Sequence, residues 1–127
     1  MGYTSPVRTP LVILALLLPA CAAFGGDKEE AERLRRQITA LIGEAPCNNL
    51  VNCRILGLGA RPCGGPEEYV AYSTWMRRDQ IQIRAQEYNF LREELLSREA
   101  VAGTCEALPE PRAACVSGRC VVAPAER

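Results

Sequence analysis

The chain has 127 residues, which is enough for one domain with a modest hydrophobic core, and a second domain is not expected. Of its 15 Lys and Arg residues only Arg8 precedes residue 21, so the rest of the chain carries 14 basic and 15 acidic side chains. This balance argues against a nucleic-acid-binding protein. Histidine is absent, which removes the commonest general base and the usual ligand of catalytic zinc.

The first 22 residues have the three parts of an export signal. Arg8 provides the positive region, Leu11–Leu18 is an apolar run, and small residues follow around Cys21. The run is too short for a membrane span, which needs about 20 apolar residues. We therefore predict a signal peptide over residues 1–22 and a single small domain over residues 23–127, with its ordered core at about 47–122.

The end of this segment also resembles a bacterial lipobox. In Leu18-Pro19-Ala20-Cys21 the cysteine would be acylated and become the first residue of an anchored lipoprotein. Ala22 then resembles the sorting signal of outer-membrane lipoproteins, facing the periplasm or the cell surface. Pro19 departs from the small residue usual at its position, so the alternative is ordinary cleavage after Ala22, which releases a soluble periplasmic or secreted protein.

Either route removes Cys21 from the thiols available for disulfides. The six remaining cysteines are Cys47, Cys53, Cys63, Cys105, Cys115 and Cys120. An even number in an oxidising compartment predicts three bridges, and six cysteines allow 15 connectivities, among which the sequence does not choose. Thiolate metal binding is the alternative, but no C-x-x-C pair occurs, and we predict neither a metal nor another cofactor.

Residues 28–42 have the pattern of an amphipathic helix. One stripe carries the apolar side chains Ala31, Leu34, Ile38 and Leu41. Asp27 and Glu30 resemble a capping box, and Gly43 followed by Pro46 ends the helix. We interpret it as a packing helix, with docking of a partner as the alternative.

A second helix is expected over residues 80–100. Asp79 is the predicted cap, with Gln82 at the third helical position, and Gly103 closes the segment. Its apolar stripe comprises Ile81, Ala85, Tyr88, Leu91 and Leu95. The charged residues between 92 and 99 lie mostly off this stripe and indicate a solvated face.

The segment between these helices is predicted to contain a strand, a turn and a short helix. Residues 51–57 read as the strand, and residues 61–66 form a turn cluster. Pro66 suits the first turn of a helix through Tyr69, Val70 and Tyr72, with Glu67 and Glu68 at its positive end. A phosphate cradle at Gly64 and Gly65 is a weaker interpretation than backbone room beside Cys63.

Near the carboxyl end, Ser117-Gly118 separates two strand-prone runs and predicts a β-hairpin. With a two-residue loop, Cys115 and Cys120 lie opposite each other on one face. They could then bond to each other, or each could join the hairpin to Cys53 or Cys105. A bulged three-residue loop would change this register.

These elements predict an α+β fold, with two main helices packed on a small antiparallel sheet and stapled by disulfides. The sheet is expected to contain the strand at residues 51–57 and the terminal hairpin. Trp75, Tyr69, Tyr72 and Tyr88 are expected to supply an aromatic core, and an exposed platform for sugar binding is the alternative.

Between residues 47 and 122 the pattern of cysteines, glycines and prolines resembles a group of small exported bacterial proteins with a C-G-G-P motif. Here the motif is Cys63-Gly64-Gly65-Pro66, followed by Tyr88-Asn89 and by Cys105, Pro109, Pro111, Cys115, Gly118 and Cys120. The group consists mostly of hypothetical proteins or lipoproteins without a known activity. The resemblance implies a shared disulfide scaffold and a location in the cell envelope.

The resulting functional hypothesis is a non-enzymatic envelope lipoprotein that acts as a rigid binding module. Its partner would be an envelope protein or a wall component, and it would touch the membrane only through a lipid on Cys21. The candidate binding loop comprises Leu58, Arg61, Pro62, Gly64, Gly65 and Pro66. The alternatives are a structural or stress-related lipoprotein without a specific ligand, and a secreted inhibitor-like protein. No catalytic residues are predicted, because Glu67 and Glu68 are adjacent on the expected helix and cannot face each other.

Overall fold

The computed structural model describes residues 1–3, 23–99, 103 and 105–125. The predicted signal run and the predicted acylation site at Cys21 therefore lie outside the described residues. Within the described part, the chain forms an α+β domain, as predicted.

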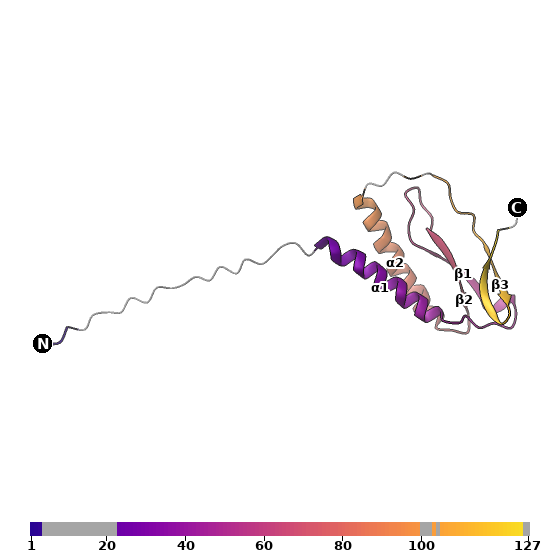
Figure 1. Ribbon diagram of the computed structural model, residues 1–127, viewed down its shortest axis with the longest axis horizontal. Coiled ribbons are helices and arrows are strands. Elements are labelled where there is room, and N and C mark those ends of the chain that lie inside the picture. Colours follow the sequence, from indigo (N-terminus) through magenta and orange to yellow (C-terminus); the bar gives the residue numbers. More distant parts are fainter. Residues whose placement is uncertain (4–22, 100–102, 104, 126–127) are drawn as a thin grey trace.

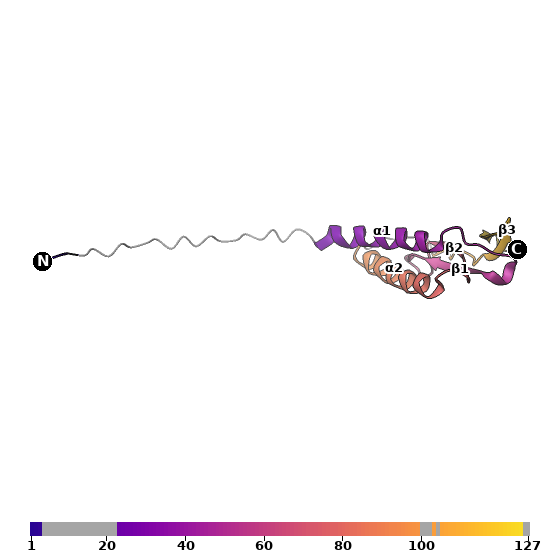
Figure 2. The same ribbon diagram turned by 90° about the horizontal axis from the view of Figure 1, so that it is seen from below.

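The elements follow the order helix, two strands, helix, two strands. They are α1 (Ala23–Ile42), a short 3-10 helix (Leu50–Asn52), β1 (Cys53–Leu58), β2 (Glu68–Ser73), α2 (Arg78–Glu99), β3 (Arg112–Val116) and β4 (Arg119–Ala123). Figures 1 and 2 show α1 and α2 side by side, with the strands gathered toward one end of the helix pair. The helices are antiparallel, because ion pairs join Lys28 to Glu99 and Asp27 to Arg98.

The main core lies between the two helices and β1. Both predicted helix stripes contribute to it, so the helical periodicity is confirmed. Its buried members are Ala31, Leu34, Ile38, Leu58, Ala85, Tyr88 and Leu95. A second, smaller cluster surrounds the cysteines near the hairpin and comprises Ala45, Cys47, Cys53, Ala71 and Cys120.

The helix starts differ from those predicted. α1 begins at Ala23, so Asp27 lies inside the helix instead of capping it, and its carboxylate pairs with Arg98 of α2. α2 begins at Arg78, and the Ile81 N–H donates to the Arg77 carbonyl, which places Asp79 in the first turn. The ion pair with Arg98 stabilises Asp27 inside α1, and the helix dipole stabilises Asp79 in the first turn of α2. A capping pattern in the sequence does not distinguish these positions from a true cap.

The predicted short helix through Tyr69, Val70 and Tyr72 is wrong. These residues form β2, which pairs antiparallel with β1 from Cys53↔Ser73 to Leu58↔Glu68. Aromatic and β-branched side chains favour the pleated strand, and pairing with β1 satisfies the backbone of both segments. The start signal at Pro66 therefore belongs to a loop between two strands.

In its described part, the structure has two small sheets where one was predicted. β1 pairs with β2, and the terminal hairpin of β3 and β4 forms its own two-stranded sheet. The strand begins at Cys53, two residues later than predicted, because Leu50–Asn52 form a 3-10 turn capped by the Asn49 side chain.

The predicted terminal hairpin is confirmed, and of the two loops considered it has the two-residue one. Ser117 and Gly118 have φ values of 52° and 76°, which are typical of the type I′ turn that matches strand twist. Cys115 and Cys120 are opposite each other, as expected for this loop.

The six cysteines after residue 22 form the three predicted disulfides. The pairs are Cys47–Cys115, Cys53–Cys120 and Cys63–Cys105. Cys115 and Cys120 do not bond to each other, and Cys115 joins Cys47, which was not among the partners considered for it. Because the bridged residues are 68, 67 and 42 positions apart, closure of each loop contributes about 4 kcal/mol in the chain-entropy view.

Leu58 tests how far the main core determines stability. Its side chain is fully buried at the end of β1, so Leu58→Ala is expected to lower the free energy of unfolding by about 2 to 5 kcal/mol. Urea denaturation measures the change. The matched control is Leu108→Ala, at an exposed position, for which a change of about 0.5 kcal/mol or less is expected. Equal effects of the two substitutions would contradict this description of the core.

Candidate functional site

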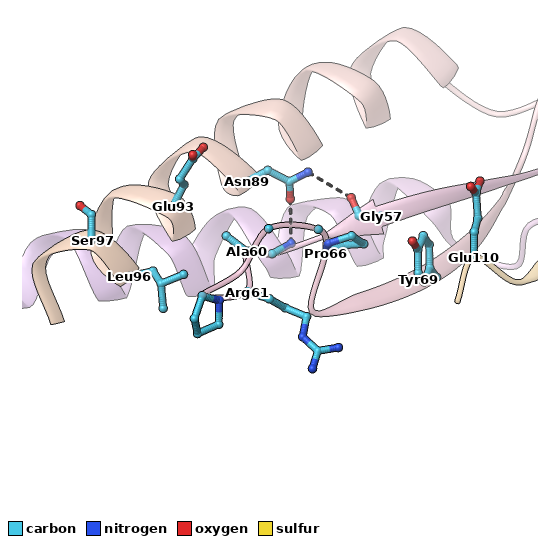
Figure 3. A pocket seen from close by; sticks show the side chains of 14 residues that line it. Gly57, Ala60, Arg61, Pro66, Tyr69, Asn89, Glu93, Leu96, Ser97 and Glu110 are labelled. Atoms are coloured by element: carbon cyan, nitrogen blue, oxygen red, sulfur yellow. Dashed lines mark hydrogen bonds between the residues drawn. The ribbon is translucent and has the colours of Figure 1, made fainter. Parts of the chain in front are cut away.

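A pocket lies beside the loop between β1 and β2. It has a volume of about 670 Å³ and is walled by three segments: the loop, the carboxyl-terminal half of α2, and the residues before β3 (Figure 3). Five of the six predicted loop residues line it, namely Arg61, Pro62, Gly64, Gly65 and Pro66. The helix contributes Asn89, Glu93, Leu96 and Ser97, and Glu110 comes from the segment before β3.

Leu58, the sixth predicted loop residue, belongs to the core instead. It is fully buried and packs with the helix stripes, so it is unavailable to a partner. The alternation of side chains along β1 explains the error, because the last strand residue points to the helices while the following loop faces solvent.

Backbone hydrogen bonds hold the loop in one conformation. The Glu67 N–H donates to the Leu58 carbonyl at 2.8 Å, and the Arg61 N–H donates to the Gly65 carbonyl at 3.0 Å. Gly64 and Gly65 have φ values of 93° and 82°, and an added Cβ at either would meet no atom within 4 Å. Glycine is therefore required here by the backbone conformation, and it leaves bare main chain at the pocket wall.

Asn89 of α2 fastens the loop to the helix. Its side-chain oxygen accepts from the Gly59 N–H at 2.8 Å, and its amide donates to the Gly57 carbonyl at 3.0 Å (Figure 3). Both backbone groups at the start of the loop are thus satisfied by one side chain. This role of Asn89 was not predicted, because its two contacts join residues 30 and 32 positions apart in the sequence.

Three charged side chains line the pocket without a partner. Within the described part of the chain, Arg61, Glu93 and Glu110 form no ion pair or side-chain hydrogen bond. Arg61 extends from the loop away from α2 (Figure 3). Unpaired charges of both signs at one pocket are available for a ligand, since an ion pair with a ligand displaces only water.

Glu67 and Glu68, which follow the loop, are already engaged. Glu67 pairs with Arg92 of α2 at 2.6 Å, and Glu68 pairs with Arg35 of α1 at 2.8 Å. The hydrogen bond that the Arg92 guanidinium donates to the Glu67 carboxylate raises the pKa of Arg92. Because the two carboxylates bind different helices, they hold the loop and β2 against the helix pair and do not form a catalytic dyad.

The phosphate-cradle interpretation of Gly64 and Gly65 loses its basis. The element that begins directly after these glycines is not a helix, because the chain continues into β2 at Glu68. Without a helix amino terminus, the aligned N–H groups that favour phosphate are missing.

The four aromatic residues divide between core and surface. Tyr72 and Tyr88 are buried, and burial raises the pKa of Tyr88. Tyr69 is half-buried and lines the pocket, whereas Trp75 is 51% exposed. The predicted aromatic core is therefore wrong for Trp75, which lies in the turn after β2.

A second groove, of about 450 Å³, lies between α1 and α2. Four basic side chains line it, and each is paired with an acid: Lys28 with Glu99, Arg35 with Glu68, Arg36 with Glu32 and Arg92 with Glu67. This groove therefore offers an anion much less than its four basic side chains suggest.

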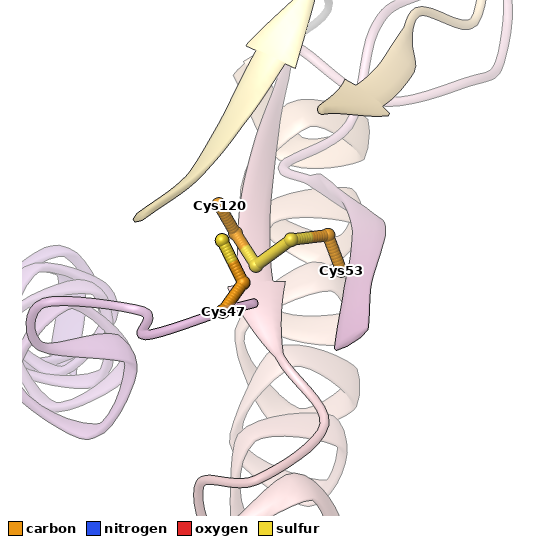
Figure 4. Close-up of side chains that lie close together, drawn as sticks. All are labelled: Cys47, Cys53 and Cys120. Carbon is orange, nitrogen blue, oxygen red and sulfur yellow. A yellow bond between two sulfur atoms is a disulfide. The ribbon is translucent and has the colours of Figure 1, made fainter. Parts of the chain in front are cut away.

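Three cysteine sulfurs lie close together near the hairpin. The Sγ atoms of Cys47, Cys53 and Cys120 are all within 4.8 Å of one another (Figure 4). All three are bonded in disulfides, and a metal ion needs thiolates, so the oxidised cluster is not a metal centre.

No protein-family model, curated protein or solved structure matches this chain. In the described ranges, neither helix combines the length and the apolar character needed to cross a membrane.

The Asn89 contacts generate a prediction about loop order. Asn89→Ala leaves the Gly59 N–H and the Gly57 carbonyl without their partner, so a loss of about 1 to 3 kcal/mol in unfolding free energy is expected. Urea denaturation measures the loss, and faster hydrogen exchange at the Gly59 amide locates it. Asn48→Ala is the control, since Asn48 is exposed and only its backbone N–H is hydrogen-bonded. Unchanged exchange at Gly59 in the Asn89 variant would contradict the assignment.

Proposed function

We propose that the protein is an exported, disulfide-stabilised binding module that engages its partner at the pocket beside the β1–β2 loop. The observation that carries this proposal is the set of unpaired charges Arg61, Glu93 and Glu110 around one pocket. The Cys63–Cys105 bridge and the Asn89 hydrogen bonds hold the loop before a ligand arrives. Such preorganisation lowers the entropic cost of binding.

The charges favour a partner that carries both a cationic and an anionic group. A guanidinium suits a carboxylate, and the two glutamates suit an ammonium or guanidinium group. The bare backbone at Gly64 and Gly65 permits close approach of a peptide main chain. We therefore propose a peptide-bearing partner, either an envelope protein or a peptide of the cell wall, and no enzymatic activity.

Substitution of the unpaired charges tests this function. Arg61→Ala, Glu93→Ala and Glu110→Ala should each weaken retention of the partner by at least about fivefold, the effect of losing roughly 1 kcal/mol at an interface. The measurement is crosslinking and pulldown from solubilised envelope, in parallel with binding to purified cell-wall sacculi.

The matched controls are Arg78→Ala and Glu29→Ala, at exposed positions on α2 and α1 away from the pocket. Equal retention by all five variants would reject the pocket as the binding site. Empty pulldowns and no binding to sacculi would instead favour the structural or stress-related lipoprotein without a specific ligand.

The proposal includes anchoring through a lipid on Cys21 in the outer membrane. Three disulfides suit an oxidising compartment outside the cytosol, which supports export. α1 starts at Ala23, so an acylated Cys21 would hold the folded domain close to the bilayer. Cleavage after Ala22 is the alternative and would give a soluble periplasmic or secreted protein.

The intact mass of the mature protein distinguishes these routes. Protein extracted from membranes is expected to begin at Cys21 with the added mass of its acyl chains. Reduction should then add two hydrogens for each of the three disulfides. A chain that begins at Ala23 without lipid would contradict acylation, and a precursor with free thiols would contradict export.

A further inference from the structure

Two of the three disulfides lie next to each other, so their four cysteines have an alternative pairing within reach. Cys115 and Cys120 are direct partners in the β3–β4 hairpin, yet each is bonded to the segment that precedes β1 or begins it. The Sγ atom of Cys47 lies within 4.8 Å of those of both Cys53 and Cys120 (Figure 4). A thiolate freed at Cys47 would therefore have a disulfide beside it.

We propose that these two disulfides form a thiol-exchange site, at which an external thiol converts the pairs Cys47–Cys115 and Cys53–Cys120 into Cys47–Cys53 and Cys115–Cys120. The substrate class is a small or protein-borne thiol. The proposal does not rest on the binding proposed for the pocket.

Differences in burial identify the point of attack. Cys47, Cys53 and Cys120 are buried, whereas Cys115 is only partly buried on the hairpin. Exchange requires approach of a thiolate to a disulfide sulfur, so access determines which sulfur reacts first. Attack at the Cys115 sulfur leaves Cys47 as a thiolate, and this thiolate lies beside the sulfurs of Cys53 and Cys120.

Three balanced steps complete the conversion. The external thiolate bonds to Cys115 and the Cys47–Cys115 bond breaks, leaving the Cys47 thiolate. That thiolate bonds to Cys53 and the Cys53–Cys120 bond breaks, leaving the Cys120 thiolate. Cys120 then bonds to Cys115 and expels the external thiolate, so no electrons are consumed and the thiol is regenerated.

The hairpin geometry accommodates the product. In a two-residue hairpin the pair next to the turn, Val116 and Arg119, shares hydrogen bonds, so the next pair, Cys115 and Cys120, does not. Consistent with this, the Cys120 N–H donates to the Ala45 carbonyl outside the hairpin, at 2.7 Å. Residues in such pairs have Cα atoms about 4.5 Å apart, within the range that a disulfide spans.

Exchange would remove both disulfides that join the hairpin strands to the rest of the domain. The polar contacts that would remain include the Cys120–Ala45 hydrogen bond, one from the Cys47 N–H to the Gly118 carbonyl at 3.0 Å, and an exposed ion pair between Arg119 and Glu44. The hairpin would then be held by hydrogen bonds and packing alone.

Treatment of the full mature protein with reduced glutathione tests the proposal. Acid quenching, alkylation of free thiols with N-ethylmaleimide and trypsin digestion without reduction then report the pairing. The native protein gives three joined peptides, residues 37–54, 113–119 and 120–127. We expect this product to be lost and replaced by peptide 37–54 with an internal disulfide and by peptide 113–119 joined to 120–127. Reduction or glutathione adducts without the exchanged peptides would overturn the proposal.

A variant that needs no external thiol provides the second test. Cys115→Ser leaves Cys47 without its partner beside Cys53–Cys120, so the maleimide label is expected on Cys53 or Cys120 as well as on Cys47. Chymotrypsin, which cleaves at Leu50, separates Cys47 from Cys53. The control Cys105→Ser frees Cys63, which lies outside the sulfur cluster, and its label should stay on Cys63. A label confined to Cys47 in the first variant would overturn the proposal.

Discussion

The position of the terminal hairpin depends on two covalent bonds to the segment at residues 47–53. The hairpin has almost no apolar core of its own, because Val116, Val121 and Val122 are exposed and only Cys120 is buried among its strand residues. It forms a sheet separate from β1 and β2, so no continuous ladder of hydrogen bonds attaches it to them. The main domain is different, since the stripes of two helices and Leu58 pack there into one cluster. Hydrophobic burial therefore organises the helix end of the molecule, and disulfides organise the hairpin end.

The sequence predicted the features that arise from local patterns. The stripes of both helices, the β-hairpin at Ser117-Gly118 and the use of six cysteines in bridges all follow from spacing along the chain. The strand at Tyr69–Tyr72 was missed because Pro66 and two glutamates imitate a helix start, while the decisive interaction is pairing with β1, a long-range contact. Connectivity was not predictable for the same reason, because each bridge joins residues at least 42 positions apart.

For the candidate site, the sequence identified the loop but not what surrounds it. The glycines and prolines around Cys63 indicated an exposed turn, and five of the six proposed residues line the pocket. Asn89 and Glu93 belong to α2, and Glu110 belongs to the segment before β3. Their proximity depends on the tertiary fold, and a polar residue on a helix face is by itself typical of solvent exposure.

The disulfides connect the pocket to the hairpin through Glu110. This residue lies between Cys105, which is bonded to the loop, and β3, whose Cys115 is bonded to Cys47. If thiol exchange breaks the Cys47–Cys115 bond, the segment around Glu110 stays joined to the loop through Cys63–Cys105. The hairpin that follows Glu110 is then no longer joined to Cys47. A pocket that requires both glutamates would then bind its partner differently in the two disulfide states, whereas the loop, held by Cys63–Cys105 and Asn89, would keep its shape. Because ligand and exchange would act on the same segment, a ligand that contacts Glu110 only in the native pairing must also disfavour the exchange.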